Sequence, residues 1–292
     1  MRLRFSICQK LLAFHPYISI ELEQNMIRVF IFILALFAAS SAVAQTRHAL
    51  LIGIDEYEHF PNYGSSAFAV SDVRALSTVL ESAGLHVTQA LNTTHDELDA
   101  ILDDFTAHIS PGDEVLIYAA GKGGHFRREQ LLLLRDAPEP STTEALASAV
   151  AQSLHIRSFA ERLSGAGANA VAMIVDTCRT TIRRRGVPMP ANADELMARP
   201  AGSAALYFYS AARNDCPTGR LGPLDRSTNS VFMRNLLPPL IVPGRSLQDA
   251  FKHARNAVFD QTADTLGKPQ VLSSDGTREA PAFLIMPPVF FR

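Results

Sequence analysis

Apolar runs and helix-like segments alternate along the chain from residue 45 onward. Short apolar runs bounded by polar or turn-forming residues are typical of buried strands. Such runs predict five core strands, at residues 49–54, 85–91, 114–121, 170–176 and 205–211. Apolar residues that recur every three or four positions predict helices, at residues 67–83, 94–110, 156–163 and 246–259.

This alternation of strands and helices predicts an α/β fold. Because successive parallel strands need a crossover, we expect a three-layer αβα sandwich with a mostly parallel sheet of about six strands. Residues 131–134 predict a further strand or hairpin arm, and residues 281–285 a closing strand. Residues 136–153, rich in Pro, Ser, Thr and Ala, predict a loop.

The first 44 residues have a different pattern and predict a leader. Arg28 is followed by an apolar run over residues 29–39, and Ala42 and Ala44 form a small-x-small cleavage site. We therefore expect a signal peptide, a true start at Met26, and a mature domain over residues 45–292 that is secreted or periplasmic. The apolar run is about half of the roughly 20 residues that span a bilayer, so a stable membrane span is the weaker alternative.

Composition narrows the possible partners. The chain has 292 residues and a net charge of −2, which favours an ordinary globular protein over one that binds nucleic acid. The basic run at residues 183–185 favours a solvated loop over a nucleic-acid site. Three cysteines without paired spacing do not predict a zinc site, and we expect no metal and no cofactor.

Candidate chemistry follows two of the predicted strands. The third strand ends at the turn Gly121-Lys122-Gly123, and the fourth ends at Asp176-Thr177-Cys178. Functional groups collect at the carboxyl ends of parallel strands. A cysteine after an apolar strand is by itself more often a small packed residue than a nucleophile.

Four segments resemble the caspase-like cysteine peptidases, in particular the bacterial metacaspase-type branch: RHALLIGIDEY from residue 47, SDVRAL from residue 71, YAAGKG from residue 118 and VDTCR from residue 175. The resemblance implies a caspase-like domain in which Cys178 attacks a peptide carbonyl and the backbone N–H groups of Gly123 and Cys178 hold the oxyanion. It also implies that Asp72 and Asp176 bind an arginine or lysine before the cut bond of a protein or peptide substrate. Without the resemblance, Asp72 could be a helix-face carboxylate and Asp176 a strand-end cap.

Lys122 departs from the family pattern, which has histidine at this position. A histidine protonates the leaving amine because its pKa lies near neutral, whereas lysine titrates near 10.4. His125 is a possible substitute. A catalytically impaired protein that binds peptides or has a structural role is therefore the alternative to an active endopeptidase.

A redox interpretation is also open. Removal of the leader leaves two cysteines, Cys178 and Cys216, in a compartment that favours disulfides. A Cys178–Cys216 disulfide is feasible only if the two α-carbons approach within about 7 Å.

Overall fold

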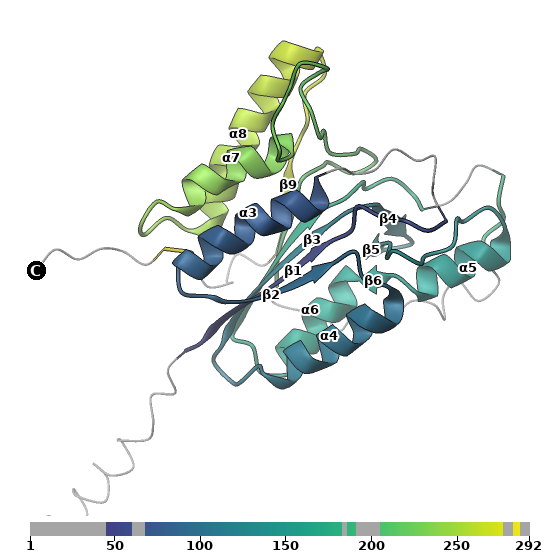
Figure 1. Ribbon diagram of the computed structural model, residues 1–292, viewed down its shortest axis with the longest axis horizontal. Helices are drawn as coiled ribbons and strands as arrows, with labels where there is room; N and C mark the ends of the chain where they lie inside the picture. Colours follow the sequence, from purple (N-terminus) through teal and green to yellow (C-terminus); the bar gives the residue numbers. More distant parts are fainter. Residues whose placement is uncertain (1–44, 60–67, 183–185, 191–204, 277–282, 287–292) are drawn as a thin grey trace, which may run out of the picture. The chain divides into compact units, whose positions relative to one another are not determined.

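The fold is centred on a six-stranded sheet in the order β2-β1-β3-β7-β8-β9 (Figure 1). The structure is a computed structural model that describes residues 45–59, 68–182, 186–190, 205–276 and 283–286. Strands β1, β2, β3, β7 and β8 run parallel to one another, and β9 runs antiparallel to β8. The strands are β1 (Arg47–Gly53), β2 (His86–Leu91), β3 (Glu114–Ala120), β7 (Ala170–Asp176), β8 (Leu206–Tyr209) and β9 (Ser273–Asp275). The predicted mostly parallel sheet of about six strands is thus confirmed.

The middle strands are buried because the sheet is covered on both faces. Every residue of β7 is buried, and β3 is buried from Val115 to Ala120. Residues that alternate along these strands enter two separate hydrophobic clusters: Leu51 and Tyr118 face one cluster, and Ile52 and Ile117 face the other. This burial explains the continuous apolar runs of the sequence.

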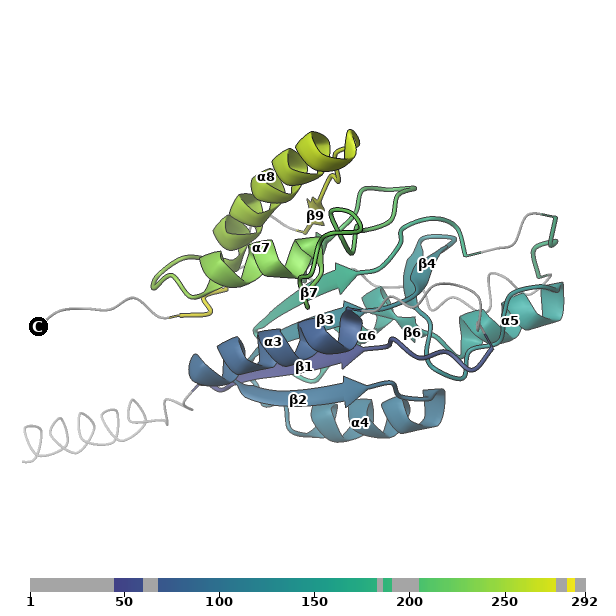
Figure 2. The same cartoon turned by 45° about the horizontal axis from the view of Figure 1, so that its top comes forward.

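Helices form the outer layers (Figures 1 and 2). The helices α3 (Ala69–Ser82), α7 (Val231–Leu240) and α8 (Leu247–Leu266) cover one face, and α4 (His95–Ala107) and α6 (Ile156–Gly165) cover the other. The capping box predicted at the start of α4 is present, since Thr94 Oγ1 accepts from the Glu97 N–H. The three-layer αβα sandwich is confirmed.

A second sheet of three strands, β4 (Gly123–Phe126), β5 (Glu129–Leu132) and β6 (Leu154–His155), follows the glycine turn. The predicted hairpin arm at residues 131–134 falls partly in β5. The loop predicted over residues 136–153 is wrong, because α5 (Thr143–Ala151) lies within it. Thr142 caps α5, and its apolar face packs on the small sheet through Leu146, Ala149 and Val150.

The C-terminal part also differs from the prediction. The sixth strand is β9, whereas Leu284, in the predicted strand at residues 281–285, makes an isolated bridge to Ser246. Pro281 and Ala282 lie outside the described residues. Helix α7 was not predicted, because Pro238 and Pro239 in its last turn interrupt the sequence pattern.

The predicted leader at residues 1–44 and the basic run at residues 183–185 lie outside the described residues, so both remain predictions. Among the residues that are described, no helix is long and apolar enough to cross a membrane.

Candidate active site

The ends of β3 and β7 lie side by side, as the sequence predicted. In the register of the two strands Ala120 pairs with Asp176, and the Gly121 N–H donates to Asp176 O over 3.3 Å. A Cβ atom on Gly123 would meet Leu131 O and the side chain of Thr177, the residue before Cys178. The glycine turn and the cysteine-bearing segment are therefore neighbours, and glycine is needed for their close approach.

The hydroxyl group of Tyr57 holds the turn at Gly121-Lys122-Gly123. This hydroxyl accepts a hydrogen bond of 2.6 Å from the Lys122 N–H and donates to Ile54 O. Gly121 has a φ of +147°, and a Cβ there would lie 2.6 Å from the same hydroxyl. Both the backbone conformation and the space thus require glycine at this position.

The Lys122 side chain extends over the aromatic ring, with Nζ 5.1 Å from the ring centroid of Tyr57. Partial burial lowers the pKa of the Lys122 amine below its ordinary value, and the negative charge of Asp55 opposes this effect. Asp55 in turn accepts the N–H groups of Ala69 and Val70 at the start of α3. A lysine in this setting is a better proton donor than a free lysine.

Cys178 forms a disulfide with Cys216, and their α-carbons are 4.0 Å apart. Two backbone hydrogen bonds bring the segments together: the Arg179 N–H donates to Asp215 O, and the Asn214 N–H donates to Arg179 O. The disulfide that the sequence offered as a possibility is thus present, and the sulfur of Cys178 is bonded to that of Cys216.

His125 lies on β4 beside the segment that follows Cys178, but both of its ring nitrogens contact other groups. Nδ1 is 2.7 Å from Arg179 O, and Nε2 is 3.1 Å from Thr181 Oγ1. A carbonyl can only accept, so Nδ1 donates to Arg179 O, and in the neutral imidazole Nε2 accepts from the threonine hydroxyl. This arrangement uses His125 to join β4 to residues 179–182.

Gln130, which the sequence analysis missed, holds the backbone at the cysteine. Its Nε2 donates to Thr177 Oγ1 and to Cys178 O, each over 2.9 Å. Gln130 is buried on β5, a strand with two polar and two apolar residues. A polar pair, Glu129-Gln130, ahead of a run of leucines was the signal that could have indicated it.

Asp72 is a buried residue on α3. One oxygen of its carboxylate accepts hydrogen bonds, and the other does not. Oδ1 accepts from Asn229 Nδ2 over 2.8 Å and from the Ser230 N–H over 3.0 Å. Oδ2 is buried without a hydrogen-bond partner among the described residues. Burial, together with the charge of Asp176, raises the pKa of Asp72 to about 7.

Asp176 ends β7 and is buried near Asp72. Its Oδ2 accepts from the Tyr118 hydroxyl over 3.1 Å. Burial raises the pKa of Asp176, and the hydrogen bond from Tyr118 acts in the opposite direction. The two acidic residues therefore interact in one buried region, Asp72 on a helix and Asp176 at the end of a strand.

The comparison with protein families matches the Caspase domain over residues 46–281, most of the chain. The chain belongs to the caspase domain family. Among solved structures it is similar to caspase-1 from Spodoptera frugiperda, with a TM-score of 0.58 and 14% sequence identity, over 84% of this chain and 91% of that chain. That identity supports the shared fold alone. No curated protein sequence was found to match the chain.

For a caspase domain, the structure brings together Cys178, the turn that carries Lys122 and Gly123, and the acidic pair Asp72 and Asp176. The family is one of cysteine peptidases. The roles of these residues in substrate binding or catalysis stay predictions. In the described part of the chain, no group of three or more histidine, cysteine, aspartate or glutamate side chains could hold a metal ion.

Proposed function

We propose that this caspase-domain protein binds an arginine or lysine side chain of a polypeptide at Asp72 and Asp176 without cutting the chain. The observation that carries the proposal is the state of Cys178, whose sulfur is bonded to Cys216 while Lys122 stands at the position of the proton donor. A sulfur in a disulfide has no thiolate, and the thiolate is the nucleophile of a cysteine peptidase.

The acidic pair supports binding of a cation. Burial and the charge of Asp176 raise the pKa of Asp72, because two carboxylates would otherwise both be charged in a poorly solvated place. A guanidinium or ammonium group placed at Asp72 Oδ2 would give that oxygen a donor and favour the ionised form of the carboxylate. A basic side chain therefore fits this site better than a neutral or acidic one.

The contacts of His125 support the absence of cutting. Nδ1 contacts Arg179 O and Nε2 contacts Thr181 Oγ1, so at least one of these contacts would have to break before His125 served the sulfur of Cys178. Proton donation to a leaving amine would then fall to Lys122.

A second candidate is an endopeptidase that becomes active on reduction, and the lowered pKa of Lys122 favours it. Two thiols of a reductant would convert the disulfide into the two free cysteines and become a disulfide themselves. The Cys178 thiolate would attack the carbonyl carbon of the basic residue, and Lys122 would protonate the leaving amine. Water would then hydrolyse the thioester, which releases the new carboxyl end and returns Cys178.

The two candidates are separated by measuring binding and cleavage together. Fluorescence polarisation of a labelled, capped tetrapeptide amide that ends in arginine would be compared with the same peptide ending in citrulline, which has the shape of arginine but no charge. We expect tighter binding of the arginine peptide, loss of that preference in Asp72→Asn, and no cleavage before or after reduction. Cleavage by the reduced wild type that Cys178→Ala abolishes and Lys122→Ala slows would establish the second candidate. Equal binding of both peptides would contradict a basic-side-chain site in either case.

A further inference from the structure

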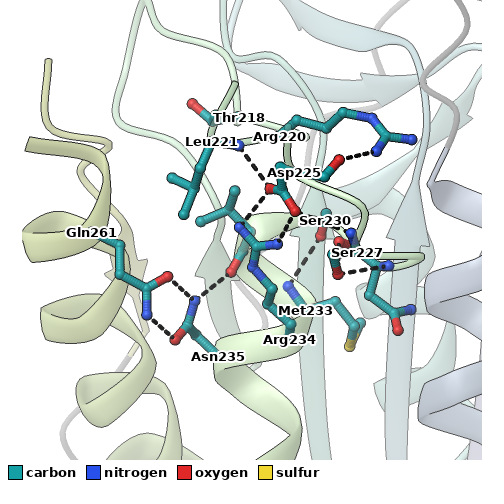
Figure 3. Close-up of polar contacts among 12 residues, drawn as sticks. Thr218, Arg220, Leu221, Asp225, Ser227, Ser230, Met233, Arg234, Asn235 and Gln261 are labelled. Atoms are coloured by element: carbon teal, nitrogen blue, oxygen red, sulfur yellow. Dashed lines mark hydrogen bonds and ion pairs between the residues drawn. The ribbon is translucent and has the colours of Figure 1, made fainter. Parts of the chain in front are cut away.

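Polar contacts around Asp225 hold together residues 218–230. The last two residues of this segment, Asn229 and Ser230, donate hydrogen bonds to Asp72. Figure 3 shows Arg234 of α7 reaching back to the carboxylate of Asp225. Arg234 Nη1 donates to Asp225 Oδ1 over 2.9 Å, and Nη2 lies 2.9 Å from Oδ2. The side chain of Asp225 is 10% exposed and that of Arg234 is 22% exposed, so water screens this pair less than a surface pair.

The same carboxylate also binds the backbone of its own segment (Figure 3). Oδ2 accepts from the Leu221 N–H over 2.8 Å, and Oδ1 accepts from the Ser227 N–H over 3.0 Å. The bond to Arg234, with these two N–H groups, holds the pKa of Asp225 well below its ordinary value. Asp225 is therefore ionised at neutral pH. Its carboxylate holds together the backbone at Leu221 and at Ser227.

Hydrogen bonds lead from this turn to Asp72. Ser227 Oγ contacts both the N–H and the carbonyl of Asn229, over 3.2 and 2.9 Å. Asn229 Nδ2 and the Ser230 N–H then donate to Asp72 Oδ1. Ser230 also caps α7, because its side chain accepts from the Met233 N–H. The two donors at Asp72 are thus held by Ser227 on one side and by the start of α7 on the other.

Through these bonds the two oxygens of Asp72 become unequal. Oδ1 has two donors, and Oδ2 has no partner among the described residues although it is buried. If Asn229 were free to turn, its amide could satisfy either oxygen, or both in turn. A fixed Asn229 leaves Oδ2 without a donor, so a cation that reached this oxygen would supply one.

We propose that Asp225 is a positioning residue for the basic-side-chain site, acting through Ser227 and Asn229 to keep Asp72 Oδ2 directed to a bound guanidinium or ammonium group. The inference rests on the proposed function. It adds a residue that determines specificity without contacting the ligand.

The test measures the preference for arginine over citrulline in the oxidised full chain, with the two labelled peptides described above. Asp225→Asn removes the charge-assisted bonds to Arg234, and Ser227→Ala removes the hydroxyl that holds Asn229. We expect each to reduce the preference about tenfold, the usual effect of losing a hydrogen bond that involves a charged group. Asp103→Asn is the matched control, because Asp103 forms an exposed ion pair with Arg162 on the opposite face of the sheet.

The pH dependence of binding provides a readout that a purely structural role would not move. Binding of the arginine peptide should rise as Asp72 ionises, around pH 7. Loss of the donors from Asn229 and Ser230 would raise the pKa of Asp72, so the midpoint of binding should move to higher pH in Asp225→Asn, Ser227→Ala and Asn229→Ala.

The outcomes are distinct. Without any preference in the wild type, the proposed function fails and this inference fails with it. With a preference in the wild type that Asp225→Asn and Ser227→Ala both retain, at an unchanged midpoint, the proposed function stands and the inference is overturned. If Asp225→Asn does not fold, Ser227→Ala and Asn229→Ala decide: a reduced preference and a raised midpoint support the inference, and wild-type values overturn it.

Discussion

Replacing Asp72 by asparagine should stabilise the protein at pH 8 while it removes binding of basic side chains. In the folded protein the pKa of Asp72 is raised to about 7 from its ordinary value of 3.8, so folding favours the neutral carboxyl. At about 1.4 kcal/mol for each tenfold change in an ionisation constant, the difference corresponds to about 4 kcal/mol. Asparagine has nearly the same shape, and its carbonyl can keep the two donors at Oδ1.

The sign of the effect follows from which state binds the proton more tightly. Below about pH 4 the carboxyl is protonated in both the folded and the unfolded chain, and its contribution to stability is fully present. As the pH rises from about 4 to about 7, the unfolded chain ionises first and that contribution is lost. We therefore expect Asp72→Asn to be more stable than the wild type by about 2 to 4 kcal/mol at pH 8, and by little or nothing at pH 4.

The measurement is urea denaturation of the oxidised protein, followed by circular dichroism, at pH 4, 6 and 8. The variant must be compared with the wild type at each pH, because burial also raises the pKa of Glu129 to about 7. Asp103→Asn should change the unfolding free energy by less than about 1 kcal/mol at all three values, since its partner Arg162 and its own carboxylate are exposed. A variant at Asp72 that is no more stable than the wild type at pH 8 would refute the reasoning.

Three other predictions test the cysteines, the lysine and the leader. Cys178 and Cys216 should resist alkylation until the protein is reduced, and Cys216→Ser should leave Cys178 open to alkylation and lower the unfolding free energy by about 4 kcal/mol, as expected for a loop closed over a separation of 38 residues. Two alkylated thiols in oxidised protein would contradict this. In the reduced protein, Lys122→His should raise turnover on arginine or lysine peptides to about a hundredfold or more above the wild-type background, and Cys178→Ala in that variant should abolish it. No gain would show that more than the proton donor is missing. Mass spectrometry of natively expressed protein should find a mature N-terminus at Gln45, whereas intact residues 1–44 on a soluble cytoplasmic protein would refute export.

The buried strands could be predicted because their environment leaves a clear pattern. The runs at β1, β3 and β7 are apolar on both faces, since helices cover both faces of the middle strands. Once these strands are taken as parallel, the neighbourhood of residue 122 and Cys178 follows from the rule that parallel strands end at one edge. The Cys178–Cys216 pairing could only be offered as a possibility, because it depends on backbone bonds between segments that are distant in sequence.

Other features leave no periodic signal. Strand β9 is three polar or small residues at the edge of the sheet, where there is no core to select apolar side chains. Helix α5 is rich in alanine, so its apolar face is narrow and the segment resembles a loop. The pair Asp225 and Arg234 meets because a turn brings the chain back onto α7, and neither residue reveals its partner in the sequence.

Residues 211–230 connect the two halves of the site. Near one end, Cys216 is bonded to Cys178, and at the other end Asn229 and Ser230 are bonded to Asp72. Reduction of the disulfide would release the first attachment, whereas the bonds of Asp225 and Arg234 would still hold the second. The availability of the sulfur and the arrangement of the acidic pair are therefore controlled separately. A buried carboxylate that lowers stability near neutral pH contributes little to the fold itself, and such residues are typically found where function requires them. The buried acidic pair is therefore consistent with the proposed binding of a basic side chain by the oxidised form of the domain.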